Sequence, residues 1–299
     1  MSVAPRRDRL IFTFIFLLQY VNADVGTENH PAWALLDSFN CGESVADRII
    51  GGVNAALGQF PWIARLGYTN KYGVTDWMCG GALITDSHVV TAAHCTLAPE
   101  EYTLSFIRLG EYDTETNPDC LMGVCAPPVQ DIQVKNILTH ANFDNPSFHN
   151  DIAIIELNKP AVLNDYVSTI CLPRDNSASL EVGERATVAG WGKMNMTTEE
   201  TARILQVISL PIVEPEMCDI AGVGFQVKRS EICAGAQYNK DACGGDSGGP
   251  LMKILDTPEG PKTHLLGVVS FGPTMCGIRK PGVYSYVPYF MKWILDHII

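Results

Sequence analysis

The chain has 299 residues, of which 46% are hydrophobic and 18% are charged, with a formal net charge of −12 at pH 7. This length is enough for one large two-layer domain or two small ones. The acidic balance argues against nucleic acid and anionic membrane surfaces as partners, because both favour basic patches. It favours cationic substrates only weakly, since an acidic surface also keeps a protein soluble.

Residues 1–23 have the three-part pattern of a secretory signal peptide. Three arginines form a basic head, residues 10–21 are mostly apolar, and small residues allow cleavage after Ala23. The alternative is a membrane anchor, which needs about 20 apolar residues, and this run is shorter and contains polar side chains. We therefore expect a secreted, extracellular protein without a membrane anchor.

The ten cysteines indicate an oxidising compartment. After a signal peptide, an even cysteine count predicts disulfides, here five of them, although spacing alone does not determine the connectivity. A zinc site is not expected, because no Cys-x-x-Cys pair or Cys/His cluster has ligand spacing.

Secondary structure is predicted to be almost entirely β. Residues 24–48 are polar and acidic with little periodicity, so we expect a flexible leader there. The rest of the chain has short apolar runs, such as 152–157 and 265–270, separated by Gly, Pro, Asn and Asp, a pattern typical of a β-barrel or sandwich. Only residues 287–299 have helical spacing.

Three motifs carry candidate chemistry: His94 in Thr-Ala-Ala-His-Cys, Asp151 in His-Asn-Asp-Ile-Ala, and Ser247 in Gly-Asp-Ser-Gly-Gly-Pro. Glycine neighbours leave the serine hydroxyl uncrowded, and a nucleophilic serine needs a base and an orienting acid. Taken singly, these residues could be a core histidine, a capping carboxylate and a turn serine. Spaced by 57 and 96 residues in this order, they indicate a catalytic triad.

From Ile49 to the C-terminus, the chain resembles the trypsin-like serine endopeptidases of the chymotrypsin fold, which have the same triad order. The resemblance implies an all-β, chymotrypsin-like fold with two six-stranded antiparallel β-barrels packed side by side and a C-terminal α-helix. With the signal peptide over 1–23, the resemblance divides the rest of the chain into an activation propeptide over 24–48 tethered by Cys41 and a protease domain over 49–299. The site would lie in the cleft between the barrels.

Catalytic roles follow from the resemblance. His94 would take the proton of Ser247 and return it to the leaving amine, while Asp151 would hold the imidazole tautomer. The N–H groups of Gly245 and Ser247 would form the oxyanion hole. No cofactor is implied for catalysis. The rival interpretation is a catalytically silent homologue that acts as a cascade cofactor or binding scaffold.

Specificity is implied by residues near the serine. Asp241 would form the floor of the primary pocket and pair with Arg or Lys of the substrate, and Gly272 and Gly282 would leave its walls open. The alternative interpretation of Asp241 is an exposed charge on a loop. A carboxylate at this position disfavours a digestive enzyme with chymotrypsin- or elastase-type specificity. Ala242, where many relatives have serine, lacks a hydroxyl contact for the shorter lysine, so we predict a preference for Arg.

Activation by proteolysis is also implied, because Asp47-Arg48-Ile49-Ile50-Gly51-Gly52 resembles the zymogen junction of the family. Cleavage after Arg48 would free an α-ammonium on Ile49 that pairs with Asp246. An ordinary strand start is the alternative. The basic Arg48 implies an upstream trypsin-like activating protease, and we expect a serpin-type inhibitor as a further partner.

Segments 108–113, 116–120 and 125–128 look like arthropod haemolymph proteases that carry a clip domain and act in immune or developmental cascades. A clip domain needs six cysteines, and only Cys41 precedes the catalytic domain, so we expect the module to be absent. Three carboxylates here could provide oxygen ligands for a structural Ca²⁺, with a solvated acidic loop as the alternative. They are Glu111, Asp113 and Asp119.

The resemblance implies the disulfides Cys79–Cys95, Cys218–Cys233 and Cys243–Cys276 within the domain. Cys41 and Cys171 would then tie the leader to the body, and the remaining Cys120 and Cys125 would close a small loop. Separately, Asn195-Met196-Thr197 is a glycosylation sequon.

Overall fold

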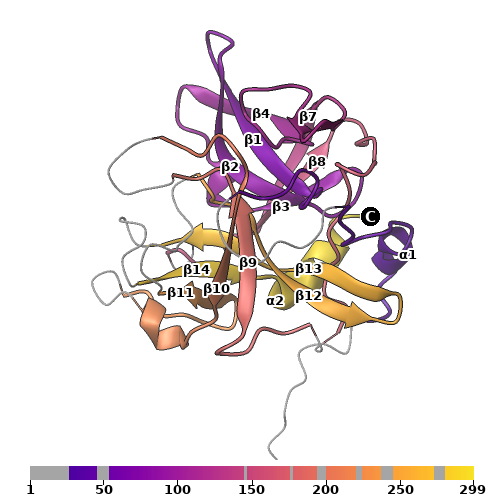
Figure 1. The fold of residues 1–299 in the computed structure, drawn as a ribbon. Helices are drawn as coiled ribbons and strands as arrows, with labels where there is room; N and C mark the ends of the chain where they lie inside the picture. The colour runs from indigo at the N-terminus through magenta and orange to yellow at the C-terminus, as the bar shows by residue number, and fades with distance from the viewer. Residues whose placement is uncertain are drawn as a thin grey trace, which may run out of the picture.

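The computed structural model describes residues 27–45, 54–144, 147–175, 178–193, 200–219, 224–236, 245–272 and 280–299, and the statements below concern these residues. Two groups of strands lie one above the other, with a helix at the C-terminal end beside the lower group (Figure 1).

The first group is a closed antiparallel barrel whose strands follow the order β1-β2-β3-β8-β7-β4. The strands are β1 (Ile63–Asn70), β2 (Thr75–Leu83), β3 (His88–Thr91), β4 (Tyr102–Leu109), β7 (Gln130–Thr139) and β8 (Ala153–Leu157). β-branched residues that pack well in strands fill the interior; for example, Val90 pairs with Ile154, and both are fully buried.

The second group is a six-stranded antiparallel sheet with the order β10-β9-β12-β13-β14-β11. Its strands are β9 (Arg185–Gly190), β10 (Gln206–Pro211), β11 (Glu231–Gly235), β12 (Pro250–Thr257), β13 (Gly260–Phe271) and β14 (Pro281–Tyr286). A bridge between Ile212 and Ala234 brings the two ends of the sheet together. The predicted all-β fold with two barrels is confirmed.

The smaller elements lie at the edges of the barrels. The predicted C-terminal helix is α2 (Val287–Asp296), which packs against β13 and buries Phe290 and Ile294. The remaining elements are α1 (Ala32–Leu36), the 3-10 turns η1 (His94–Thr96) and η2 (Pro215–Cys218), and the short hairpin of β5 (Cys120–Leu121) and β6 (Val124–Cys125).

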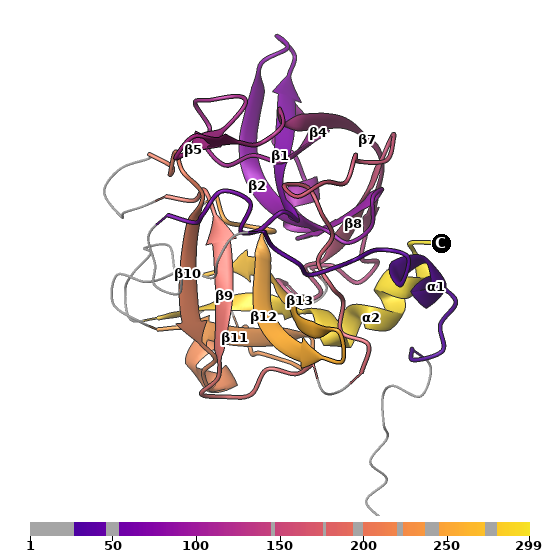
Figure 2. The same ribbon diagram turned by 45° about the vertical axis from the view of Figure 1, so that its right-hand side comes forward.

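The prediction of a flexible leader over 24–48 is wrong for residues 27–45, which fold onto the body. α1 lies beside α2 (Figure 2), Ala32 is fully buried, and Trp33 donates a hydrogen bond to the Thr27 carbonyl at 2.6 Å. The guanidinium of Arg174 lies 4.3 Å from the centre of the Trp33 ring. A helix as short as α1 does not show helical periodicity, so this packing could not be predicted from the sequence.

Four of the five expected disulfides are present: Cys41–Cys171, Cys79–Cys95, Cys120–Cys125 and Cys218–Cys233. The fifth, Cys243–Cys276, lies outside the described residues. Within the described ranges, no helix has the length and apolar character needed to cross a membrane.

Candidate active site

His94 is the first residue of the 3-10 turn η1, which follows strand β3 in the chain. Its Nδ1 lies 2.7 Å from Oδ2 of Asp151, and its backbone N–H donates to Oδ1 of the same carboxylate at 2.9 Å. The carboxylate is thus bound to two atoms of His94. A carboxylate on Nδ1 favours the tautomer in which Nε2 is free to accept a proton.

Asp151 is buried two residues before β8, and the second barrel fixes it. Ser270 in β13 donates its hydroxyl to Oδ2 at 2.5 Å, and Ser285 in β14 donates to the Asp151 backbone carbonyl at 2.6 Å. A buried carboxylate needs such donors, because desolvation without them is costly. Neither serine was identified from the sequence. The only sequence signal for either residue is a single hydroxyl side chain within an otherwise apolar strand.

Ser247 lies in the turn before β12, where the chain passes very close to the first barrel. Gly80 in β2 donates its N–H to the Ser247 carbonyl at 2.7 Å. The next residue, Gly248, has φ +78°, and a Cβ there would lie 2.2 Å from Oγ1 of Thr91. Only glycine fits this position, which explains one glycine of the motif physically.

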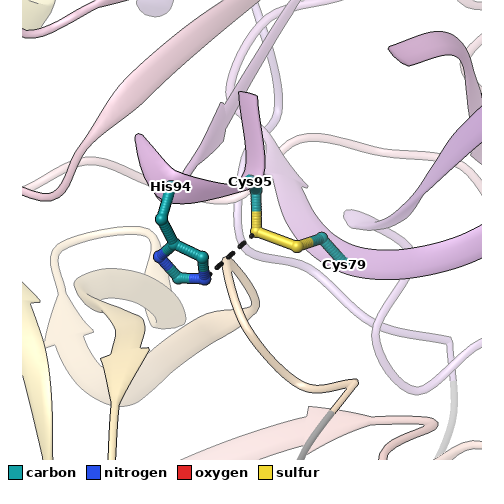
Figure 3. A group of neighbouring side chains, drawn as sticks. All are labelled: Cys79, His94 and Cys95. Atoms are coloured by element: carbon teal, nitrogen blue, oxygen red, sulfur yellow. Dashed lines mark hydrogen bonds between the residues drawn. A yellow bond between two sulfur atoms is a disulfide. The ribbon is translucent and has the colours of Figure 1, made fainter. Parts of the chain in front are cut away.

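His94 and Asp151 are thus hydrogen-bonded to each other, and the turn of Ser247 approaches the same barrel at Gly80 and Thr91. Between the described residues Ser247 and His94, no hydrogen bond is present. Nε2 of His94 instead lies 3.6 Å from Sγ of Cys95, which is bonded to Cys79 (Figure 3). Catalytic hydrogen bonds are often long or misaligned before substrate binds.

The same three residues in Figure 3 form the one group of His, Cys, Asp or Glu side chains, among those described, that lies close enough to share a metal ion. Both sulfurs belong to the Cys79–Cys95 disulfide, however, and a metal is bound by thiolate. The cluster with His94 is therefore unsuited to a metal.

Asp246 directs its carboxylate into a narrow space formed by two glycines. Oδ1 accepts a hydrogen bond from the N–H of Gly192 at 2.8 Å. A Cβ on Gly190 would lie 2.2 Å from Oδ1, and one on Gly192 would lie 2.4 Å from Oδ2. Its proposed partner Ile49 and the junction residue Arg48 lie outside the described residues.

The two glycines predicted to line the pocket lie side by side, because a Cβ built on Gly272 would lie 3.7 Å from Cα of Gly282. The pocket floor residues Asp241 and Ala242 lie outside the described residues, as does Asn195. Gly245, a predicted oxyanion-hole residue, has φ +101°, a conformation that favours glycine.

The three acidic residues predicted to bind Ca²⁺ are instead occupied by protein donors. Arg203 binds both oxygens of Asp113 at 2.6 and 2.7 Å, and these hydrogen bonds lower the pKa of that carboxyl. Asp119 accepts from the Tyr112 N–H at 2.8 Å, and Glu111 lies 3.1 Å from Arg108.

Burial raises the pKa of Glu111, because desolvation penalises the charged form of its carboxyl. In the structure, the ligand atoms of Glu111, Asp113 and Asp119 do not lie close enough together to form a group that could share an ion. The expected ligand set is not assembled here, and calcium binding itself stays an untested prediction.

Comparisons with known proteins agree with this geometry. A family model described as Trypsin matches residues 49–294. CLIP domain-containing serine protease HP8 of Bombyx mori is 40% identical over 286 residues, which cover 92% of this chain and 76% of that protein. Phenoloxidase-activating enzyme 1 of Spodoptera litura is 40% identical over 264 residues, covering 86% and 69% respectively.

Among solved structures, the chain is similar to the Drosophila Grass clip serine protease of the Toll pathway. The TM-score is 0.76 at 32% sequence identity, and the alignment covers 88% of this chain and 76% of the other.

Proposed function

We propose, from the premise that this chain belongs to the trypsin family of serine proteases, that it is a secreted zymogen activated by cleavage after Arg48. The active form would hydrolyse peptide bonds after Arg and, less readily, after Lys. The observation that carries the catalytic part is the His94–Asp151 pair, which second-barrel hydroxyls fix beside the turn of Ser247.

In the proposed reaction, the hydroxyl of Ser247 attacks the carbonyl carbon of the substrate while Nε2 of His94 takes the hydroxyl proton. The N–H groups of Gly245 and Ser247 stabilise the oxyanion that forms. His94 then gives the proton to the departing amine, which leaves an acyl-enzyme. Water then attacks the acyl carbon while His94 takes its proton. The bond from this carbon to the oxygen of Ser247 breaks, His94 returns the proton to that oxygen, and the carboxylic acid product leaves. Asp151 stabilises the imidazolium in both halves.

The specificity proposal rests on residue identity and on the open pocket walls. Gly272 and Gly282 lie next to each other, and neither has a side chain that would take up space in the pocket proposed for a long basic residue. Asp241 supplies the charge that pairs with it, and Ala242 supplies no hydroxyl for a lysine ammonium.

The activation proposal is supported by the surroundings of Asp246. Its carboxylate lies against Gly190 and Gly192, where any side chain would clash. A free ammonium on Ile49 carries the charge opposite to this carboxylate and would pair with it, as the family resemblance implies. Cleavage after Arg48 is what creates that ammonium.

The physiological setting is proposed from the names of relatives. One is named a phenoloxidase-activating enzyme and another a protease of the Toll pathway. We propose that this protein likewise acts on protein substrates in an immune or developmental cascade, with an upstream trypsin-like activator and a serpin-type inhibitor.

Controlled cleavage after Arg48, followed by labelling with a fluorophosphonate, tests the proposal. The cut protein should react at Ser247 and hydrolyse an Arg-anilide much faster than a Phe-anilide. Ser247→Ala is the matched control and should not be labelled. A non-catalytic scaffold would not react before or after cleavage, and equal turnover of matched Arg and Lys peptides would contradict the specificity.

A further inference from the structure

A small cavity between the two barrels brings an arginine close to Asp246. Asp246, Gly190 and Trp191 of the second barrel line it together with Arg65 and Trp77 of the first. The cavity has a volume of about 30 Å³, which is space for one or two water-sized groups. A carboxylate, with its two oxygens, is a group of that size.

The guanidinium of Arg65 is largely buried, yet no residue that the structure describes accepts a hydrogen bond from it. Its side chain is 13% exposed, and the nearest described carboxylate oxygen, Oε2 of Glu111, is 3.8 Å away. That oxygen already accepts a hydrogen bond from Arg108 at 3.1 Å. A guanidinium has several N–H donors, and buried donors are usually paired. Arg65 therefore has donors left for another acceptor.

Arg65 is also a costly residue at this place in the sheet. Its partner in the pairing of β1 with β4 is Arg108, so two like charges lie directly opposite each other. Arg108 is compensated by two hydrogen bonds to Asp131, at 2.7 and 2.8 Å. Burial lowers the pKa of Arg65 to about 10, and the charge of Glu111 offsets this only in part. Arg65 is thus a cation at neutral pH that contributes little to stability, which points to another role.

Trp191 connects this cation to Asp246. The guanidinium of Arg65 lies 5.2 Å from the centre of the Trp191 ring, within the range of a cation–π contact. The residues on either side of Trp191 are Gly190 and Gly192, the two glycines that confine the Asp246 carboxylate. Contact with a ring occupies a face of the guanidinium and leaves the N–H groups at its edge for an acceptor.

The turn that carries Asp246 can change its conformation, and cleavage changes the charges around it. Gly245 has φ +101° and Gly248 has φ +78°, and glycine moves between backbone conformations more freely than any other residue. In the uncut chain the nitrogen of Ile49 belongs to the peptide bond with Arg48 and has no charge. Hydrolysis of that bond makes it an ammonium.

We propose that Arg65 is the partner of Asp246 before activation. In the uncut chain, the Asp246 carboxylate turns from Gly192 into the cavity and accepts charge-assisted hydrogen bonds from the guanidinium. After cleavage, the ammonium on Ile49 competes with Arg65 and returns the carboxylate to Gly192, which is the arrangement that the structure shows. This inference rests on the proposed activation after Arg48.

Arg65 is a positioning residue in this proposal, because it touches neither substrate nor reacting atoms. It acts through Asp246 on the two neighbours of that residue, Gly245 and Ser247, whose N–H groups form the proposed oxyanion hole. While Arg65 holds Asp246, these N–H groups are displaced and the uncut chain has little activity. The equilibrium between the two arrangements then sets the residual activity of the zymogen.

The rate at which a fluorophosphonate labels Ser247 in the uncut chain tests this role. An Arg48→Gln background prevents cleavage by trypsin-like proteases. In that background, Arg65→Met should raise the labelling rate about tenfold, the factor expected when a charge-assisted hydrogen bond no longer holds the inactive arrangement. In the cleavable chain after cutting, the same variant should keep kcat for an Arg-anilide within about twofold of the wild type, because Ile49 then holds Asp246.

Three further variants keep the test decisive. Arg65→Lys retains the charge and should label within about twofold of the uncut wild type. Arg65→Gln, a milder change if the methionine variant does not fold, should label about threefold faster. Arg108→Met is the matched control: its guanidinium lies 4.4 Å from the Trp77 ring and binds Glu111, but it does not line the cavity. Its uncut labelling rate should stay at the wild-type value.

The inference is overturned if the folded Arg65 variants label no faster than the uncut wild type, or if Arg108→Met raises the rate equally. It is also overturned if Arg65→Met lowers the activity of cut and uncut chains alike, since Arg65 would then support the active arrangement. Failure of the proposed function is recognised differently. The cut wild type would then not react with a fluorophosphonate, or would react no faster than the uncut chain.

Discussion

Each barrel fixes a proposed catalytic residue of the other, but by different means. Asp151 of the first barrel is bound by the hydroxyls of Ser270 and Ser285 from the second. Ser247 of the second is located by close backbone approach to Gly80 and Thr91 of the first. The first contact depends on side chains that can be removed one at a time. The second depends on the absence of a side chain.

The largest effect is expected for Asp151→Asn, which changes the carboxylate that the second-barrel hydroxyls contact. The amide would keep the size of the carboxylate but favour the wrong imidazole tautomer of His94, so kcat should fall about 10⁴-fold, as the same exchange does in other Ser-His-Asp proteases. Steady-state kinetics of the activated enzyme measure this. A loss below tenfold would mean that Asp151 does not orient His94.

The next largest effect is expected for Gly248→Ala, which adds a side chain where the turn of Ser247 lies against the first barrel. The added Cβ would lie 2.2 Å from Thr91 Oγ1 and 2.5 Å from the Gly80 carbonyl, so the serine turn must shift. A displacement near 1 Å lowers kcat by about 100-fold, which the rate of acylation would show. Gly73→Ala is the control: Gly73 has a similar φ of +80° but no atom within 4 Å of the new Cβ, and activity should be retained.

Removal of one hydroxyl should have a smaller effect. Ser270→Ala takes one donor from the buried carboxylate of Asp151, at a cost of about 1–3 kcal/mol, so kcat should fall about tenfold. Ser285→Ala removes a donor to the backbone carbonyl instead. This variant should lower the midpoint of thermal unfolding and leave kcat within about threefold. Equal kinetic losses in both would show that the carboxylate contact has no special role.

The smallest effect is expected away from the site, at Asp113 and Arg203. Hydrogen bonds from Arg203 hold the pKa of Asp113 below its ordinary value of 3.8. The ionised pair therefore stabilises the fold above about pH 4 and loses this effect as the pH falls through the lowered pKa. Thermal unfolding should show Arg203→Met less stable than the wild type at pH 7, with a difference that disappears in acid. A difference independent of pH would exclude the pairing as its cause.

Features that depend on short stretches of residues could be predicted from the sequence. Short apolar runs separated by Gly, Pro, Asn and Asp predicted the β fold. Four disulfides were assigned correctly from the resemblance. His94, Asp151 and Ser247 were recognised because each lies in a motif that can be read without knowing its neighbours in space.

Contacts between side chains that are far apart in the chain could be identified in the tertiary structure but not in the sequence. Ser270 and Ser285 contact Asp151 across more than a hundred residues, and Arg203 takes the carboxylate of Asp113 that was expected to bind calcium. The leader around Trp33 folds for the same reason: its apolar turn is stabilised by burial against a distant helix. Hydrogen bonds and burial depend on proximity in space, and a linear pattern carries no record of that proximity.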